Sequence, residues 1–335
     1  MNGPGCTGLA LNEKLLFEHS DPGRIGYSLP PLDVPAVEPA AELCRDEVTG
    51  FPELSEIDVV RHFTRLSTWN YGVDSGFYPL GSCTMKYNPK VNEAAARLPG
   101  LAELHPATPD HLAQGMLALL HQSQEMLAEI SGLPAIALQP AAGSHGELAG
   151  MLVIRAYHEA QGNPRHKVLI PDTAHGTNPA SAAMCGYDVV AIEETGGQLS
   201  AERVAALMDE DVAALMITNP NTLGLFESEI RTICEVVHAK GGLVYCDGAN
   251  LNALLGIARP GDMGIDVMHF NLHKTFSTPH GGGGPGSGPV GVSAALEPFR
   301  PAPVVVNEGD TFSLDYDRPQ SIGRLRSFYG NFGIM

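Results

Sequence analysis

The sequence predicts an α/β protein with a mostly parallel sheet that helices cover on both faces. Short apolar runs alternate with amphipathic segments from about residue 111 onward, which is the pattern of repeated βα units. Gly (38) and Pro (26) are plentiful among the 335 residues, while aromatic residues make up only 6%. This composition suits many tight connections and is less typical of a β-sandwich. A hydrophobic content of 44% is enough for a large core in one or two domains.

Residues 1–110 are predicted to form an extended, loop-rich arm. Four prolines fall between residues 30 and 39, which excludes a regular helix or a central strand there. Helices are expected over Ser55–Leu66 and Pro89–Leu98, so the arm is not without structure. We expect the arm to wrap over another surface.

Residues 111–320 are predicted to form the large domain. A helix over His111–Ile130 precedes a strand over Ala135–Leu138, a glycine-containing turn and a helix over Glu147–Gln161. Further helices are expected over Ala201–Met208 and Glu229–Ala239. The other apolar runs are predicted strands: Val168–Ile170, Val189–Ile192, Val212–Ile217, Leu243–Cys246 and Val267–Phe270. Ligands of such sheets bind outside the carboxyl ends of the strands, so the chemistry is predicted directly after these runs.

Charge and cysteine usage exclude several classes of protein. The chain has 20 Lys and Arg against 38 Asp and Glu, a formal net charge of −18, which argues against nucleic acid or an anionic membrane as partner. The six cysteines are scattered without a Cys-x-x-Cys pair, so neither a metal site nor a disulfide framework is predicted. No secretory signal and no run of roughly 18 apolar residues is found. We therefore expect a cytoplasmic protein.

Polar clusters follow two of the earlier strands. The first contains Gly143, Ser144 and His145, where small residues and a helix amino terminus offer backbone N–H groups to an anion. An ordinary strand–helix turn with Ser144 as the N-cap explains this cluster equally well. The second contains His175 and Thr177, and its histidine could stack on a flat heteroaromatic ring or relay a proton. Alone, it is more simply a capping loop whose histidine faces solvent.

Two further clusters follow the later strands. Asp247 ends an apolar strand, where a buried carboxylate needs a cationic or hydrogen-bonding partner. A protonated pyridinium nitrogen would be such a partner, and a helix-capping aspartate is the alternative. Lys274 follows the last strand, where partial burial would lower the pKa of its amine and favour the nucleophile that forms an imine. The run Gly281–Gly284 lacks the Gly-Lys-Ser/Thr ending of a nucleotide loop.

The order of the four clusters is a stronger signal than any one of them. An anion-binding turn, a histidine, a strand-end aspartate and a lysine 27 positions later follow one another along the chain. This order favours pyridoxal phosphate held covalently through Lys274 and an enzyme that acts on an amino acid.

Four motifs resemble a known family. The chain looks like the fold-type I pyridoxal phosphate enzymes, and more narrowly like the glycine cleavage system P-protein family. It is most similar to the lysine-bearing second subunit of the form that is split into two subunits. The first and last motifs are long and specific to that family. The motifs are Gly76–Lys90, Ala174–Pro179, Thr218–Gly224 and Asn271–Gly291.

The resemblance implies a role for each cofactor-binding residue. Lys274 would hold pyridoxal phosphate as a Schiff base, Asp247 would pair with the ring nitrogen, and His175 would stack on the ring. Asn219 would contact the phenolic oxygen, and Thr177 is counted among the cofactor contacts. The amides around three residues would bind the phosphate: Gly143, Ser144 and His145.

The resemblance also places a substrate side and a missing domain. Cys83 on the substrate side is more simply a buried small hydrophobe than a catalytic thiol. Members of the family have a large domain with a seven-stranded sheet and a small C-terminal domain. Residues 321–335 would begin that small domain, which this chain does not complete. The segment Tyr78–Lys86 is expected to line the substrate side, and its candidate site residues are Tyr78, Ser82, Cys83 and Thr84.

The implied reaction is the decarboxylation of glycine with transfer of the aminomethyl group to the lipoyl arm of the H-protein. The implied partner is a first subunit that lacks the lysine, in a heterotetramer of two of each subunit. Two alternatives stay open. One is another fold-type I enzyme, such as an aminotransferase or a cysteine desulfurase. The other is a catalytically incomplete fragment that acts as a scaffold, although a scaffold needs neither Lys274 nor Asp247.

Overall fold

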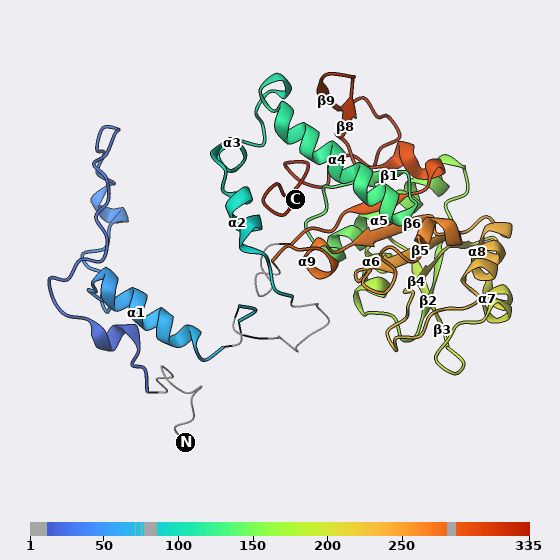
Figure 1. Ribbon diagram of the computed structural model, residues 1–335, viewed down its shortest axis with the longest axis horizontal. Coiled ribbons are helices and arrows are strands. Elements are labelled where there is room, and N and C mark those ends of the chain that lie inside the picture. The colour runs from blue at the N-terminus through green and yellow to red at the C-terminus, as the bar shows by residue number, and fades with distance from the viewer. Residues whose placement is uncertain (1–11, 71, 75, 77–85, 280–285) are drawn as a thin grey trace. The chain divides into compact units, whose positions relative to one another are not determined.

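The computed structural model describes residues 12–70, 72–74, 76, 86–279 and 286–335 (Figure 1). The chain divides into two compact units, unit 1 (residues 1–78) and unit 2 (residues 79–335). The domain boundaries expected near residues 110 and 320 stay predictions.

Unit 1 contains one regular helix and very little core. Its elements are η1 (Leu16–His19), η2 (Ala41–Leu43) and the predicted helix α1 (Glu56–Ser67). A capping box starts α1, because Ser55 Oγ accepts from Asp58 N at 3.3 Å and the Asp58 carboxylate accepts from Ser55 N at 3.1 Å. Among the described residues of unit 1, only Leu54 and His62 are buried.

The helices of unit 2 include all the predicted ones, and three α-helices of the described residues were not predicted. None of the helices in the described residues is both long and apolar enough to span a membrane. The short 3-10 helices are η3 (Asp110–Leu112), η4 (Pro260–Met263) and η5 (Ala294–Phe299). The α-helices are α2 (Lys90–Ala96), α3 (Pro99–Ala102), α4 (Gln114–Ser131), α5 (Gly143–Ala160), α6 (Thr177–Met184), α7 (Ala201–Leu207), α8 (Ile230–Ala239) and α9 (Leu272–Thr275). Those that were not predicted are α3, α6 and α9.

A seven-stranded sheet forms the centre of unit 2, in the order β1-β7-β6-β5-β4-β2-β3. All neighbouring pairs are parallel except the two that involve β7, which is antiparallel to both β1 and β6. A separate hairpin joins β8 (Val304–Asn307) and β9 (Phe312–Asp315). The strands of the large sheet are β1 (Ala135–Ala137), β2 (Lys167–Pro171), β3 (Asp188–Ile192), β4 (Val212–Ile217), β5 (Leu243–Gly248), β6 (Val267–Phe270) and β7 (Val290–Val292).

Helices cover both faces of the sheet (Figure 1). Side chains of the central strands alternate between two cores, one on each face. In β4, Leu215 and Ile217 belong to the core shared with α4, α7 and α8. Ala214 and Met216 belong to the core shared with α5 and α6. A strand buried on both faces carries an unbroken apolar run because neither face meets water. The predicted fold class is confirmed.

Two helices near the predicted site differ from the prediction. Helix α5 starts at Gly143, four residues before the predicted start at Glu147. Helix α6 starts at Thr177, in the cluster whose simpler interpretation was a capping loop, and it contains Pro179. Proline is compatible with the first turn of a helix, where its missing N–H has no intrahelical partner to lose. The anion-binding turn and the loop after β2 are therefore first turns of helices.

Residues 321–335 pack on unit 2 on both sides of the sheet. Tyr329, Phe332 and Met335 lie against the core that contains α4, and Leu325 lies against the core that contains α5. Ser321 Oγ donates to Arg300 O at 2.5 Å, which ties the start of this segment to the end of η5. The expectation that the segment begins a further domain stays a prediction.

Candidate active site

The predicted site residues lie at one edge of the sheet. Strands β1, β2, β4, β5 and β6 run in the same direction, so their carboxyl ends meet at that edge (Figure 1). His175 follows β2, Asn219 follows β4, Asp247 lies near the end of β5, Lys274 lies in α9 after β6, and Gly143 begins α5 after β1. The edge is where parallel sheets bind ligands.

Asp247 is buried and held by neutral and positive groups. Its Oδ2 accepts from Asn178 Nδ2 at 3.0 Å, and its Oδ1 accepts from Ala249 N at 3.0 Å and lies 3.4 Å from His269 Nε2. Burial alone would raise the pKa of Asp247, but the charges of His269 and Lys274 and the two hydrogen bonds outweigh it. The pKa therefore lies below its ordinary value, and Asp247 is an anion at the end of a buried strand.

His269 lies beside Asp247 on the neighbouring strand, where the two residues are register partners. Its ring is 1% exposed, and its Nδ1 lies 2.7 Å from the hydroxyl of Tyr245. Burial is the main cause that raises the pKa of Tyr245, so this hydroxyl stays neutral. In the sequence His269 is simply part of a predicted apolar strand. A histidine inside an otherwise apolar run was the available signal.

Glu147 is a second buried carboxylate at this edge and was not predicted. It lies in the second turn of α5 and is 4% exposed. Thr177 Oγ1 donates to its Oε1 at 2.7 Å, and Asn178 Nδ2 donates to its Oε2 at 2.9 Å. Ser181 Oγ approaches the same Oε2 at 3.4 Å. All three donors come from α6, so one carboxylate joins two helices.

His175 is exposed at the start of α6. Its Nδ1 lies 2.7 Å from Thr177 Oγ1, the hydroxyl that donates to Glu147. This contact holds one side of the imidazole. Its exposure agrees with the predicted stacking role as well as with a solvent-facing histidine, so the role stays a prediction.

The amino end of α5 supplies unpaired N–H groups. Ala142 is its N-cap and makes no side-chain capping bond, so the first-turn N–H groups lack a side-chain acceptor. The alternative in which Ser144 caps the helix is wrong, because Ser144 lies inside the helix. His145 Nδ1 accepts from Ala141 N at 3.2 Å. Burial, and then the charge of Arg326, lower the pKa of His145, which keeps its ring neutral.

Glycines allow this helix end to touch the segment around the lysine. A Cβ on Gly143 would lie 2.5 Å from Asn271 Oδ1, and a Cβ on Gly288 would lie 2.0 Å from Ala142 O. Real Cβ atoms do not come that close, so no other residue fits at either position without a shift of its neighbours. The turn before α5 and the chain on both sides of α9 are thus packed against each other.

Lys274 is half-buried in the single turn of α9. Lys86 holds the backbone around it, because Lys86 Nζ donates to His273 O at 3.0 Å and to Thr278 O at 2.9 Å. Burial lowers the pKa of Lys86. Lys86 ends the segment Tyr78–Lys86 that is expected to line the substrate side, and its bonds to the backbone around Lys274 leave that role a prediction.

Asn219 is 6% exposed and keeps one donor unused. Its Oδ1 accepts from Glu227 N at 3.0 Å, while its buried Nδ2 has no hydrogen-bond partner among the described residues. A buried donor without a partner is costly, so this atom suits a ligand with an acceptor oxygen.

The predicted substrate-side segment Tyr78–Lys86 lies outside the described residues except for Lys86. The candidate residues that lie outside are Tyr78, Ser82, Cys83 and Thr84.

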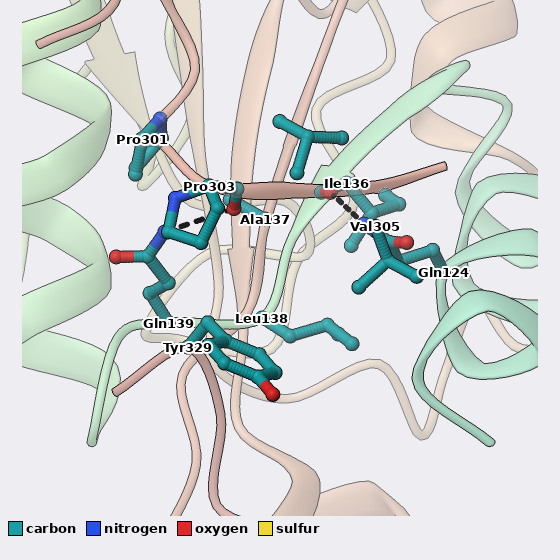
Figure 2. Close-up of a pocket in the computed structure, with 10 residues that line it drawn as sticks. Gln124, Ile136, Ala137, Leu138, Gln139, Pro301, Pro303, Val305 and Tyr329 are labelled. Atoms are coloured by element: carbon teal, nitrogen blue, oxygen red, sulfur yellow. Dashed lines mark hydrogen bonds between the residues drawn. The ribbon is translucent and has the colours of Figure 1, made fainter. Parts of the chain in front are cut away.

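A separate pocket lies between α4, β1, β8 and the C-terminal segment (Figure 2). Gln124 Nε2 donates to Ile136 O at 2.9 Å, and Gln139 Nε2 donates to Pro303 O at 3.3 Å, so its amides are already engaged. None of the predicted site residues lines it, and its lining offers no acid–base pair. The lining residues are Gln124, Ile136, Ala137, Leu138, Gln139, Pro301, Pro303, Val304, Val305 and Tyr329.

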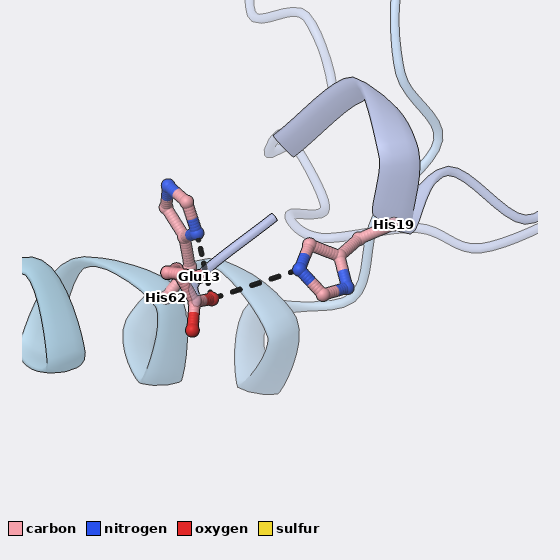
Figure 3. A group of neighbouring side chains, drawn as sticks. All are labelled: Glu13, His19 and His62. Atoms are coloured by element: carbon pink, nitrogen blue, oxygen red, sulfur yellow. Dashed lines mark hydrogen bonds and ion pairs between the residues drawn. The ribbon is translucent and has the colours of Figure 1, made fainter. Parts of the chain in front are cut away.

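Unit 1 contains a carboxylate between two histidines (Figure 3). Glu13 Oε1 lies 2.9 Å from His62 Nδ1 and 3.6 Å from His19 Nε2. Arg65 donates to both carboxylate oxygens, at 2.5 and 2.6 Å, and this guanidinium lowers the pKa of Glu13 to about 2. Because the guanidinium occupies both oxygens, the cluster is an ion pair and not a metal site.

Comparisons with known proteins agree on one family. Residues 42–306 match the family described as the glycine cleavage system P-protein. A probable glycine dehydrogenase (decarboxylating) subunit 2 from Chlorobium chlorochromatii is 58% identical over 97% of this chain and 69% of that protein. The protein of the same description from Alkaliphilus oremlandii is 56% identical over 96% of this chain and 68% of that protein. The chain thus spans about two thirds of the length of these relatives.

Solved structures show the same fold. A crystal structure of glycine decarboxylase (P-protein) of the glycine cleavage system, in inhibitor-bound form, has a TM-score of 0.65 at 24% identity. The match covers 85% of this chain and 61% of that chain. A cysteine desulfurase from Escherichia coli has a TM-score of 0.56 at 18% identity, over 78% of this chain and 66% of that chain.

Proposed function

The chain belongs to the glycine cleavage system P-protein family, and on that premise we propose that it binds pyridoxal phosphate and decarboxylates glycine. The aminomethyl group passes to the lipoyl arm of the H-protein. The observation that carries this proposal is the pair formed by the anionic Asp247 at the end of β5 and Lys274 just after the adjacent β6. The comparisons confirm the resemblance at the level of the family.

The described residues fit this cofactor. Asp247 is an anion that a protonated ring nitrogen would neutralise, and Asn219 Nδ2 is a buried donor that suits a ring oxygen. The first-turn amides of α5 from Gly143 onward would hold the phosphate, and Lys274 would hold the cofactor covalently. His175 would cover one face of the ring. Of these groups, Asn219 Nδ2 and the first-turn amides of α5 have no side-chain partner among the described residues.

The residues divide the work of the reaction. Bound pyridoxal phosphate supplies an electron sink for cleavage at the substrate's α-carbon. Asp247 would place a negative charge next to the ring nitrogen, the atom on which the electron sink needs a proton. Burial and two hydrogen bonds fix the carboxylate in place. Lys274 Nζ, once free, and the His175 ring can accept and return protons. Lys86 keeps the backbone of the lysine segment in one place through its bonds to His273 O and Thr278 O.

We further propose the partners that the family implies. These are a lysine-free first subunit, in a heterotetramer of two of each subunit, and the lipoylated H-protein, in the cytoplasm. Unit 1 supports a large interface, because it exposes many apolar side chains, such as Leu29 (82%), Val37 (85%) and Ile25 (77%). Contiguous exposed apolar surface marks a protein interface more often than free solvent-facing surface.

Covalent trapping tests the cofactor assignment. The chain is mixed with pyridoxal phosphate, reduced with borohydride, digested and analysed by mass spectrometry. We expect a pyridoxyl adduct on Lys274, loss of the adduct in Lys274→Ala and no change in Lys240→Ala, which alters an exposed lysine. A Lys274→Ala protein that still carries the adduct elsewhere and keeps its absorbance would overturn the assignment.

Release of the carboxyl carbon of glycine tests the reaction. The chain is combined with the first subunit and lipoylated H-protein, and exchange of labelled CO₂ with the glycine carboxyl group is followed. An aminotransferase or a cysteine desulfurase does not carry out this exchange, and neither does a scaffold subunit. Exchange that depends on Lys274 supports the proposal, and exchange that Lys274→Ala leaves intact contradicts it.

A further inference from the structure

Glu147 has an unusual environment for a core position between two helices. It is 4% exposed, and no ion pair involves it among the residues that the structure describes. Its hydrogen bonds come from two hydroxyls and an amide: Thr177 Oγ1, Ser181 Oγ and Asn178 Nδ2. A buried carboxylate costs free energy even when it is bonded, and apolar residues pack such positions at lower cost. The position therefore calls for an explanation beyond packing.

One of its bonds continues to His175. Thr177 Oγ1 lies 2.7 Å from Glu147 Oε1 and 2.7 Å from His175 Nδ1. A carboxylate only accepts, and a hydroxyl has one hydrogen. The hydroxyl hydrogen therefore goes to Glu147, and the histidine must donate from Nδ1. Thr177 N approaches the same Nδ1 at 3.3 Å, a contact that would suit the tautomer with its proton on Nε2. The contact with Thr177 Oγ1 is shorter and therefore stronger, so it determines the tautomer.

A second bond continues to Asp247. Asn178 is 0% exposed, and its Nδ2 donates to Glu147 Oε2 at 2.9 Å and to Asp247 Oδ2 at 3.0 Å. The two hydrogens of one amide thus bridge two buried carboxylates. His269 is the nearest side chain to Asp247 that can carry positive charge. The two carboxylates of Glu147 and Asp247 therefore favour a cationic guest next to Asp247.

We propose that Glu147 is a positioning residue that sets both side chains expected against the cofactor ring, His175 through Thr177 and Asp247 through Asn178. It touches neither the cofactor nor the substrate. Its carboxylate ties the start of α6 to α5, orients the imidazole with its proton on Nδ1, and adds a second negative charge behind Asp247. This inference rests on the proposed function for the identity of the guest, and its geometry stands on the hydrogen bonds alone.

Cofactor affinity is the first test. Pyridoxal phosphate is titrated into the apo form of the full chain and its equilibrium dissociation constant is measured by fluorescence or absorbance. We expect Glu147→Gln to raise that constant about 10- to 100-fold, because a bond to a charged group is lost and a donor is placed against the Asn178 amide. Glu159→Gln is the matched control on the same helix, since Glu159 pairs at the surface with Arg155. Equal affinities in the two variants would overturn the inference.

A double-mutant cycle tests the path through Thr177. Thr177→Val keeps the shape and removes the hydroxyl, while Thr177→Ser keeps the hydroxyl. We expect Thr177→Val to weaken cofactor binding in the normal chain and Thr177→Ser to restore it. In a His175→Ala background Thr177→Val should have a much smaller effect, because the route to His175 is gone and only the lost donor to Glu147 remains. An undiminished effect in that background would contradict the His175 branch.

The tautomer of His175 is a readout that needs no cofactor. Nitrogen-15 NMR of histidine-labelled apo chain, assigned by the signal that disappears in His175→Ala, reports which nitrogen carries the proton. We expect a proton on Nδ1 in the normal chain and its loss in Thr177→Val. A proton on Nε2 instead of Nδ1 in the normal chain would overturn the inference. This result can be obtained even if Glu147→Gln fails to fold. A normal chain that binds no pyridoxal phosphate would instead sink the proposed function and leave this test intact.

Discussion

Glu13 in unit 1 and Glu147 in unit 2 are both held by three side chains, and the chemistry of those side chains differs. Glu13 is held by the guanidinium of Arg65 and two histidines. Glu147 is held by neutral hydroxyl and amide donors. Unit 1 has two buried residues among those described, so charge pairing is a main source of its order. Unit 2 has cores on both faces of a sheet and can carry a carboxylate that costs stability.

Apolar side chains also differ between the two units, in how far they are buried. Phe270 in β6 is 0% exposed, whereas Phe51 in unit 1 is 77% exposed. Burial of an aromatic side chain contributes about 2–3 kcal/mol only where water is removed from it. The same residue type is therefore a source of stability in unit 2 and contributes little to stability in unit 1.

The largest expected effect on the free energy of unfolding comes from removing a buried aromatic side chain instead of an exposed one. Phe270→Ala should lower the free energy of unfolding of unit 2 by about 3–5 kcal/mol, through lost contacts and a cavity. Phe51→Ala should change stability by at most ~0.5 kcal/mol. Urea unfolding followed by circular dichroism measures the first. Fluorescence of Trp69, the single tryptophan, follows unit 1. Equal losses for the two variants would remove the distinction between the units.

The next effect concerns backbone approach. Gly288→Ala should cost about 1–3 kcal/mol, because its Cβ would lie 2.0 Å from Ala142 O and the start of α5 would have to move. Gly76→Ala is the matched control in unit 1, where a Cβ meets nothing within 4 Å. Both are measured by urea unfolding of the full chain. A Gly288→Ala protein as stable as Gly76→Ala would show that the two segments are not packed so closely.

Acid should act on unit 1 through Glu13. Its pKa is lowered from 4.5 to about 2, so its contribution is fully present above the ordinary pKa and is lost as pH falls toward the lowered one. We expect the Trp69 unfolding transition to weaken between pH 4.5 and pH 2. Glu13→Gln should flatten that dependence. An unchanged pH profile in Glu13→Gln would show that other carboxylates control unit 1.

The smallest expected effect is a loss of stability as the pH rises. A hydrogen bond to Asp266 raises the pKa of His238 in α8. The stability from this pair is present below the ordinary histidine pKa and is lost as pH rises through the raised one. The pair is partly exposed, so we expect His238→Gln to cost at most ~0.5–1 kcal/mol below about pH 6 and less at about pH 9. His111→Gln, at an exposed position, is the control, and a cost that grows with pH would contradict the assignment.

Elements with a strong local pattern were predictable from the sequence. The strands β4 and β5 and the helices α4 and α8 have unbroken or periodic apolar residues, and these patterns fix their type. Strand β7 has only three residues, Val290–Val292, after a glycine-rich stretch, and such a short run carries no period. Helix α6 was missed because its small polar residues and Pro179 match a loop as well as a first turn.

The site was predictable where a residue ends a strand. Asp247 and Lys274 stand out because a charged side chain directly after a buried run has few purely structural explanations. Glu147, Asn178 and His269 carry no such local signal. Their roles arise from the packing of α5 on α6 and the pairing of β5 with β6, contacts between residues 24 to 69 positions apart.

Strand β7 has a consequence for the order in which the protein can be completed during synthesis. It is the only strand that pairs with β1 among the described residues, and it separates β1 from β6, with Ala135 opposite Val292. While the ribosome is still making β7, β1 cannot join the sheet. In the described part of the chain, the turn after β1 and the lysine after β6 are then linked only through the contacts of α5. When residue 292 has emerged, β1 can take its place beside the other strands. We therefore expect the predicted cofactor site to be completed late in synthesis.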